Sequence, residues 1–83
     1  MKTLTQYGLM AEKHWRRFLP RMTAHLEATG QLLALLMEAE ERTESEMDDL
    51  RRHFRQQGLT TEQAHHQAWE LVRERYLFLP PES

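Results

Sequence analysis

Apolar residues recur along most of the chain at three- and four-residue steps, and this spacing predicts helices rather than strands. Glycine and proline divide the pattern into segments, because both residues disfavour the interior of a helix. The predicted helices span about residues 4–18, 20–28, 31–57 and 61–76, and an apolar tail ending in two prolines and polar residues follows at 77–83. The longest apolar stripe contains Leu36, Thr43, Met47, Leu50 and Phe54, and Glu40 interrupts it.

Local residues mark where these helices begin and end. Thr3 or Thr5 can cap the first helix, and Pro20 suits the first position of the second. Gly30 and Gly58 can supply the left-handed conformation that commonly follows a helix. The sequence therefore predicts a chain of helices joined by short turns.

Residues 31–57 contain neither glycine nor proline, so we predict a single helix about 40 Å long at 1.5 Å per residue. Its C-terminal half matches the last helix in length, and the two are predicted to form an antiparallel hairpin about Gly58. Thr60 and Gln63 have the spacing of a capping box at the start of that last helix. The fold class is all-α, with three to four helices in a single domain, residues 1–83.

The long helix also predicts self-association. A compact domain of this length has a diameter of roughly 30 Å, so the helix extends beyond it. Because a two-helix hairpin cannot bury both sides of its large apolar side chains, we predict a homodimer in which the extended parts pack on each other. The candidate interface residues are Met47, Phe54, Trp69, Tyr76 and Phe78. In the monomeric alternative, the first two helices fold back along the long helix as a four-helix bundle.

Composition excludes several classes of protein. Cysteine and isoleucine are absent and valine occurs once, which leaves no thiolate chemistry and little material for a sheet. The longest apolar run, residues 32–37, is too short for a membrane span, and residues 1–4 do not resemble a signal peptide. We therefore expect a soluble, cytoplasmic protein without a membrane partner.

Few residues have the spacing that enzymes or metal sites require. Ser45 lies within a helix among acidic residues, and we expect no catalytic residues and no cofactor. Glu62 with His65, and His66 with Glu70, share one helical face as in di-metal helical bundles. Those bundles need further carboxylates from other helices, so we interpret these residues as polar groups at the surface and expect no metal.

Charge is distributed unevenly, although the net value is only −2. Residues 1–25 carry a charge of +4, residues 26–50 a charge of −7, and residues 51–83 a charge of +1. The candidate contacts to nucleic acid or a protein partner are Lys13, Arg16, Arg17, Arg21, Arg51, Arg52 and Arg55. They bind phosphates, with the last helix as a recognition helix, or the basic first helix lies against the acidic part of the long helix, within the chain or across a dimer. The pI of 6.2 favours pairing, because nucleic-acid-binding domains typically exceed a pI of about 9.

The apolar tail has two interpretations. Residues 77–79 are large and apolar, and in water they would form an aggregation-prone patch. The tail either folds back to complete the core beside Trp15 or Phe18, or extends as an arm into a groove of a partner. We favour the first interpretation.

A further indication comes from the stretch PRMTAHLEATGQL at residues 20–32. It has a proline, a leucine six residues later, Thr-Gly at nine and ten, and a leucine at twelve. This pattern resembles the central signature of the small transposon-encoded TnpV proteins, and the likeness extends to Gly8, His14, Gly58-Leu59-Thr60 and Trp69. The chain lacks that family's extended N-terminal region and its Asn-containing C-terminal segment. The resemblance implies a mobile-element setting and a shared helical fold, and it implies no catalytic residue.

Together these features predict a small non-enzymatic helical protein that acts through protein–protein contacts. We expect a homodimer associated with a mobile element. The alternative is an accessory or regulatory protein that binds nucleic acid through Arg51, Arg52, Arg55 and the last helix.

Overall fold

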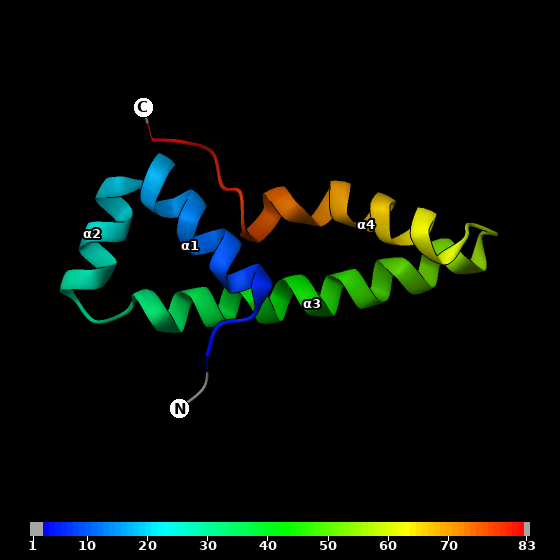
Figure 1. The fold of residues 1–83 in the computed structure, drawn as a ribbon, viewed down its shortest axis with the longest axis horizontal. Helices are drawn as coiled ribbons and strands as arrows, with labels where there is room; N and C mark the ends of the chain where they lie inside the picture. The colour runs from blue at the N-terminus through cyan, green and yellow to red at the C-terminus, as the bar shows by residue number, and fades with distance from the viewer. Residues whose placement is uncertain (1–2, 83) are drawn as a thin grey trace.

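A computed structural model describes residues 3–82 and contains four helices in that range (Figure 1). They are α1 (Gln6–Phe18), α2 (Pro20–Ala28), α3 (Leu32–Gln56) and α4 (Thr61–Tyr76). The predicted all-α class is confirmed, and each helix boundary lies within two residues of its predicted position. Lys2 of the basic segment and Ser83 of the tail lie outside the described residues.

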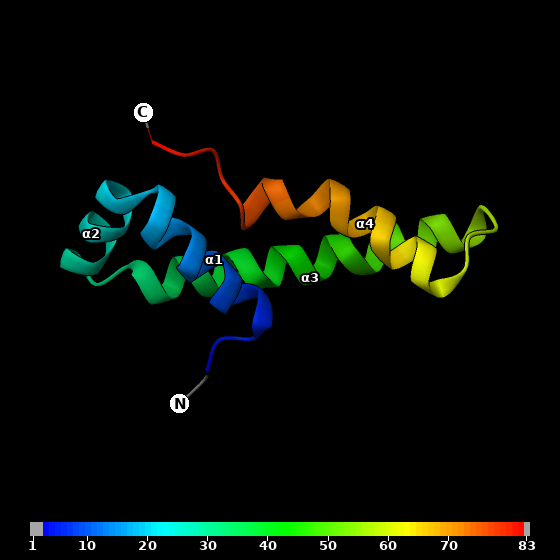
Figure 2. The ribbon, with the colours of Figure 1, turned by 45° about the horizontal axis from the view of Figure 1, so that its top comes forward.

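The two longest helices form the predicted antiparallel hairpin, and α3 continues without a break past Glu40 (Figures 1 and 2). Met47 on α3 is fully buried against Ala68 and Val72 on α4. Because alanine is small, α4 can lie close to α3 along this contact. The hairpin therefore has its own apolar seam.

The turns between helices follow the predicted glycine and capping signals. Gly30 and Gly58 have φ values of 73° and 99°, which place both in the left-handed region. After α3, the Leu59 N–H donates to the Phe54 carbonyl at 3.2 Å, as in a Schellman motif. The capping box of Thr60 and Gln63 is present at the start of α4.

Replacing Gly58 by Val is expected to lower the free energy of unfolding by about 1 kcal/mol or more, because a β-branched residue disfavours positive φ. A Cβ at this position would meet open space, so the loss reports the backbone conformation alone. Urea denaturation measures it. Gln57→Val, at φ −84°, is the matched control and should cost less than about 0.5 kcal/mol. An equal loss in both variants would contradict this explanation.

Helix α1 crosses α3 obliquely, rather than lying along it as in the four-helix-bundle alternative (Figures 1 and 2). At the start of α1, Glu40 Oε2 accepts hydrogen bonds from the backbone N–H and the hydroxyl of Thr5, each 2.7 Å long. Glu40 is only 2% exposed. Gly8 leaves room for its carboxylate, because a Cβ on Gly8 would collide with Glu40 Oε2.

This contact corrects two sequence predictions. Thr5 is the N-cap residue of α1, but its hydroxyl donates to Glu40 instead of accepting a bond from its own helix. Glu40 belongs to the buried face of α3 and does not interrupt it. A carboxylate is favoured at this place, because the N-terminus of a helix carries partial positive charge.

The larger core joins α1, α2, the first part of α3 and the tail. Its buried members are Ala11, Trp15, Leu19, Leu26, Leu32, Leu36, Ala39 and Leu77. Trp69, Tyr76 and Phe78 are half-buried against this core. The main core therefore lies at one end of the hairpin.

The predicted interface residues need correction in the light of this core. Met47 is 0% exposed within the chain, so it is not an interface residue. Phe54, Trp69, Tyr76 and Phe78 are half-buried in the two clusters of this same chain. Part of the cover that the two-helix hairpin was expected to lack comes from the same chain, because Tyr7 of α1 stacks on Trp69 with a centroid distance of 5.6 Å.

Candidate functional site

The tail folds back along α1, as the favoured interpretation predicted. The Trp15 indole Nε1–H donates to the Leu77 carbonyl at 2.9 Å, and His14 Nε2 donates to the Leu79 carbonyl at 2.8 Å. The Leu77 side chain is fully buried. These bonds place Phe78 beside the His14 ring, at a centroid distance of 5.2 Å.

The end of the tail caps α2. Glu82 N–H donates to the Phe18 carbonyl at 2.9 Å. The Glu82 carboxylate accepts from the backbone N–H groups of Arg21 and Met22 at 3.1 and 2.9 Å. Helix α2 has no side-chain cap from its own N-cap residue. The carboxylate about 60 residues later in the chain instead accepts hydrogen bonds from free backbone N–H groups in the first turn of α2.

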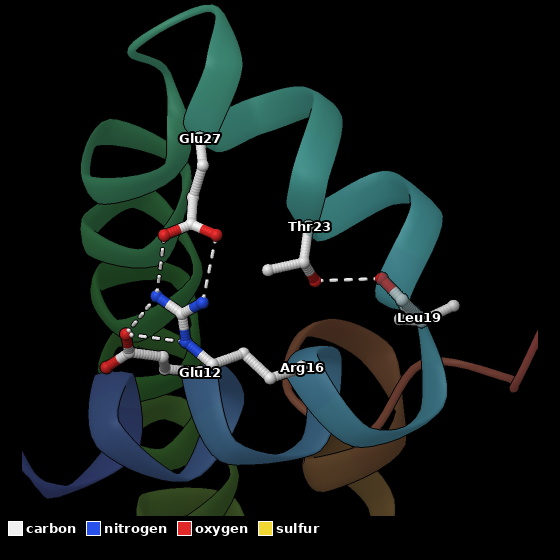
Figure 3. A network of polar contacts seen from close by, with 5 residues as sticks. All are labelled: Glu12, Arg16, Leu19, Thr23 and Glu27. Atoms are coloured by element: carbon white, nitrogen blue, oxygen red, sulfur yellow. Dashed lines mark hydrogen bonds and ion pairs between the residues drawn. The ribbon is translucent and has the colours of Figure 1, made fainter.

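An ion-pair network joins α1 to α2 (Figure 3). The Arg16 guanidinium contacts Glu12 at 2.9 Å and Glu27 at 3.0 Å. The hydrogen bonds from Arg16 hold the pKa of Glu27 below its usual value. On the facing side of α2, the Thr23 hydroxyl donates to the Leu19 carbonyl at 2.8 Å. Because the ion pairs are exposed, they orient the two helices more than they stabilise them.

An apolar groove opens between α2, α3 and the tail, with a volume of about 300 Å³. Its apolar lining consists of Met22, Leu26, Leu35, Ala39, Tyr76 and Leu79, together with Trp15. Leu35 remains 37% exposed. The main core therefore continues into an apolar surface that no described segment covers.

Charged side chains of both signs line the edge of this groove. Arg42 pairs with Glu38 at 2.9 Å, and Arg75 pairs with Glu46 across α3 and α4. Glu38, Arg42 and Arg75 line the groove itself. The nearby Glu46 carboxylate raises the pKa of the Tyr76 hydroxyl. An apolar centre with a charged edge is the usual anatomy of a protein–protein interface.

The predicted basic contacts separate into two groups. On α3, Arg51 and Arg52 pair with Asp48 and Asp49, and Arg51 also contacts the His65 ring at 3.2 Å. Arg55 donates to the carbonyl of Leu59 at 3.4 Å. The charge of this group is thus largely balanced on its own helix, which weakens the predicted nucleic-acid contact there.

The other basic group lies where α1 meets α2. Lys13, Arg17 and Arg21 form no ion pair with any residue of 3–82, whereas Arg16 is occupied by Glu12 and Glu27. Helix α1 lies against α3 at Glu40, but none of these four cations forms an ion pair with an acid of α3 within residues 3–82. Pairing with the acidic part of α3 across a dimer stays a prediction. The Arg17 guanidinium lies over the Phe18 ring, 5.2 Å from its centroid.

The residues considered for metal binding are exposed. The side chains of Glu62, His65, His66 and Glu70 are all exposed. His66 Nε2 is 3.9 Å from the Glu70 carboxylate, and His65 contacts Arg51. Within residues 3–82, no three acidic or imidazole side chains converge on a point that could hold a metal ion.

Comparisons with protein-family models, curated proteins and solved structures find no match to this chain. The resemblance of residues 20–32 to TnpV proteins therefore stays a prediction. In the described part of the chain, no helix combines the length and the apolar character needed to cross a membrane.

Sequence reasoning missed most residues of the groove. Met22, Leu26, Leu35 and Leu79 were not predicted as interface residues. The available signal was the run at residues 32–37, which is apolar on every helical face and therefore needs neighbours on all sides. In the structure Leu32 and Leu36 are buried, whereas Leu35 is left at the surface.

Proposed function

We propose that this is a cytoplasmic, non-enzymatic helical protein that acts through protein–protein contacts, as a homodimer whose protomers associate through the apolar groove. The observation that carries the proposal is the open groove, with Leu35 exposed beside the core. Large apolar side chains that line a hollow next to charged edges are typical of an interface.

The shape of the chain supports a second copy as the occupant. Its extents are 47 × 34 × 13 Å and its radius of gyration is 14.3 Å, against about 12 Å for a compact chain of this length. Its accessible surface is 5,820 Å², against about 5,200 Å² for a compact monomer of the same mass. The excess of about 600 Å² approaches the ~800 Å² per partner of a standard interface.

The charged edge also suits self-association. In a two-fold symmetric dimer the same surface of both protomers is used, so the surface has to complement itself. The edge carries acids and bases together, Glu38 and Glu46 with Arg42 and Arg75. When two copies face each other, the acids of one edge can therefore pair with the arginines of the other, and like charges need not meet.

Replacing Leu35 by Lys tests this proposal. We expect the wild-type chain to have twice the 10.0 kDa protomer mass by light scattering. Leu35→Lys should weaken dimerisation about 100-fold, because two-fold symmetry places the new charge in the interface twice. Leu9→Lys is the matched control, since Leu9 is 56% exposed and lies outside the groove. It should leave the mass unchanged.

Two results would contradict the proposal. The first is a wild-type chain of protomer mass at all accessible concentrations. The second is a dimer that Leu9→Lys dissociates and Leu35→Lys does not, which would place the interface elsewhere.

The resemblance to TnpV proteins supports a mobile-element setting for this homodimer. The supporting residues are the Pro20–Leu32 pattern, Gly8, His14, Gly58 and Trp69. Transposition genes beside the coding sequence would agree with this setting, and their consistent absence near related genes would contradict it.

A further inference from the structure

The basic side chains of residues 3–82 differ in whether an acid neutralises them. Six arginines form ion pairs: Arg16, Arg42, Arg51, Arg52, Arg73 and Arg75. Lys13, Arg17, Arg21 and Arg55 form none within the described range. The first three follow one another at four-residue steps along the corner between α1 and α2, and we name them the basic patch.

The basic patch lines two adjoining hollows. Lys13 and Arg17 line one of about 300 Å³, together with Phe18 and Phe78. Arg17 and Phe18 also line the next, of about 320 Å³, which contains Arg21. Because two residues belong to both hollows, the three cations border one continuous surface.

Among the described residues that line the two hollows, Glu82 is the one acid, and it is already engaged. Glu82 lines the second hollow, but its two carboxylate oxygens accept the backbone N–H groups of Arg21 and Met22. The side chains of the basic patch therefore remain available to an external anion. Successive cations along a surface suit a polyanion with regularly spaced phosphates.

Aromatic groups lie between these cations. Phe18 is 37% exposed, and its ring lies 4.7 Å from that of His14 and under the Arg17 guanidinium. The tail adds Phe78 to the same hollow. Nucleobases stack on such groups, and only unpaired bases can reach them, since the bases of a duplex are stacked on each other.

We propose that the basic patch is a binding site for single-stranded nucleic acid, in which Lys13, Arg17 and Arg21 contact phosphates and a base stacks against Phe18. The site lies outside the groove of the proposed homodimer and does not depend on that dimer. The expected ligand is a strand whose phosphates can contact the three cations and whose bases are unpaired and free to stack.

Fluorescence anisotropy with a labelled oligothymidylate of about 12 nucleotides tests the proposal on the full chain. We expect the logarithm of the association constant to fall linearly with the logarithm of the salt concentration. The expected slope is about −2, because three phosphate contacts to a single strand release that many counterions. A duplex of the same length should bind about tenfold more weakly. Equal or tighter binding of the duplex would overturn the single-strand assignment.

Charge variants locate the site. The triple variant Lys13→Gln, Arg17→Gln, Arg21→Gln should lose affinity by about tenfold or more. The control triple variant Arg51→Gln, Arg52→Gln, Arg55→Gln removes as much positive charge and should stay within about twofold of the wild type. Equal losses in both would show a net-charge effect and overturn the site.

Base stacking has its own readout. Phe18→Leu should weaken oligothymidylate binding about fivefold and leave binding of inorganic polyphosphate, which has no bases, unchanged. Phe18→Tyr keeps the ring and should bind as the wild type does, which separates stacking from a folding defect. An equal loss of affinity for oligothymidylate and for polyphosphate in Phe18→Leu would overturn the proposal. Tighter binding of the wild-type chain to phosphatidylserine vesicles than to the oligonucleotide would overturn it as well.

Discussion

Replacing Glu40 by Ala is expected to lower the free energy of unfolding by about 2–3 kcal/mol, although it removes a buried charge. The carboxylate accepts two hydrogen bonds from Thr5, and a hydrogen bond to a charged group makes a net contribution of about 1.5–3 kcal/mol. Without it the Thr5 N–H loses its partner and α1 loses the anion at its N-terminus. Urea denaturation at one fixed protein concentration measures the loss.

The controls for this prediction are on the same helix. Glu44→Ala removes an exposed carboxylate one turn later and should change stability by less than about 0.5 kcal/mol. Glu40→Gln keeps an acceptor oxygen but loses the charge, and an intermediate loss is expected. A Glu40→Ala variant as stable as Glu44→Ala would show that this contact does not hold α1 in place.

Replacing Gly8 by Ala is expected to destabilise the chain by about 1–2 kcal/mol, whereas Gly→Ala inside a helix ordinarily stabilises by about 1 kcal/mol. The added Cβ would collide with the Glu40 carboxylate and also come within 2.9 Å of Leu4 Cδ2. Because Glu40 is buried, its carboxylate can move aside only by giving up its bonds to Thr5. The sign of the effect is therefore the diagnostic result.

A double-mutant cycle separates the two collisions. In the Glu40→Ala background, Gly8→Ala should cost nothing or stabilise the chain by up to about 1 kcal/mol, because only the helix preference remains. The same loss in both backgrounds would assign the clash to Leu4 and contradict the proposed pairing of Gly8 with Glu40. Urea denaturation of the four proteins gives the coupling energy.

Features set by neighbouring residues could be predicted from the sequence. Gly30 and Gly58 end helices, Pro20 begins one, and the capping box of Thr60 and Gln63 begins another. Each of these signals acts over a few residues, so its physical cause is visible in the sequence itself. The hairpin could be predicted because the last helix matches the C-terminal half of α3 in length and a short turn at Gly58 joins the two.

Features set by distant residues could not be predicted in this way. Thr5 is separated from Glu40 by 35 positions, and Glu82 from the first turn of α2 by about 60. Two local anomalies belonged together: an acid within an apolar stripe, and a glycine within a helix. Gly8 makes room for Glu40, so each anomaly explains the other.

The candidate interface shifted for a related reason. The prediction treated the hairpin of α3 and α4 in isolation and therefore left Met47 and Trp69 uncovered. In the structure α4 itself buries Met47, and Tyr7 of α1 and Phe78 of the tail cover Trp69. Leu35 and Leu79 are left on the groove. Tyr76 alone among the five predicted residues lines the groove in the structure.

The most direct test of the central claim is an isotope-filtered nuclear Overhauser experiment on an equal mixture of labelled and unlabelled chains. If the groove is covered by a second copy, intermolecular signals will arise from the methyl groups of Leu35 and Leu79 and from the Tyr76 ring. Leu9 should give none. Intermolecular signals confined to Leu9, or their complete absence at concentrations where the chain is folded, would contradict the homodimer built on this groove.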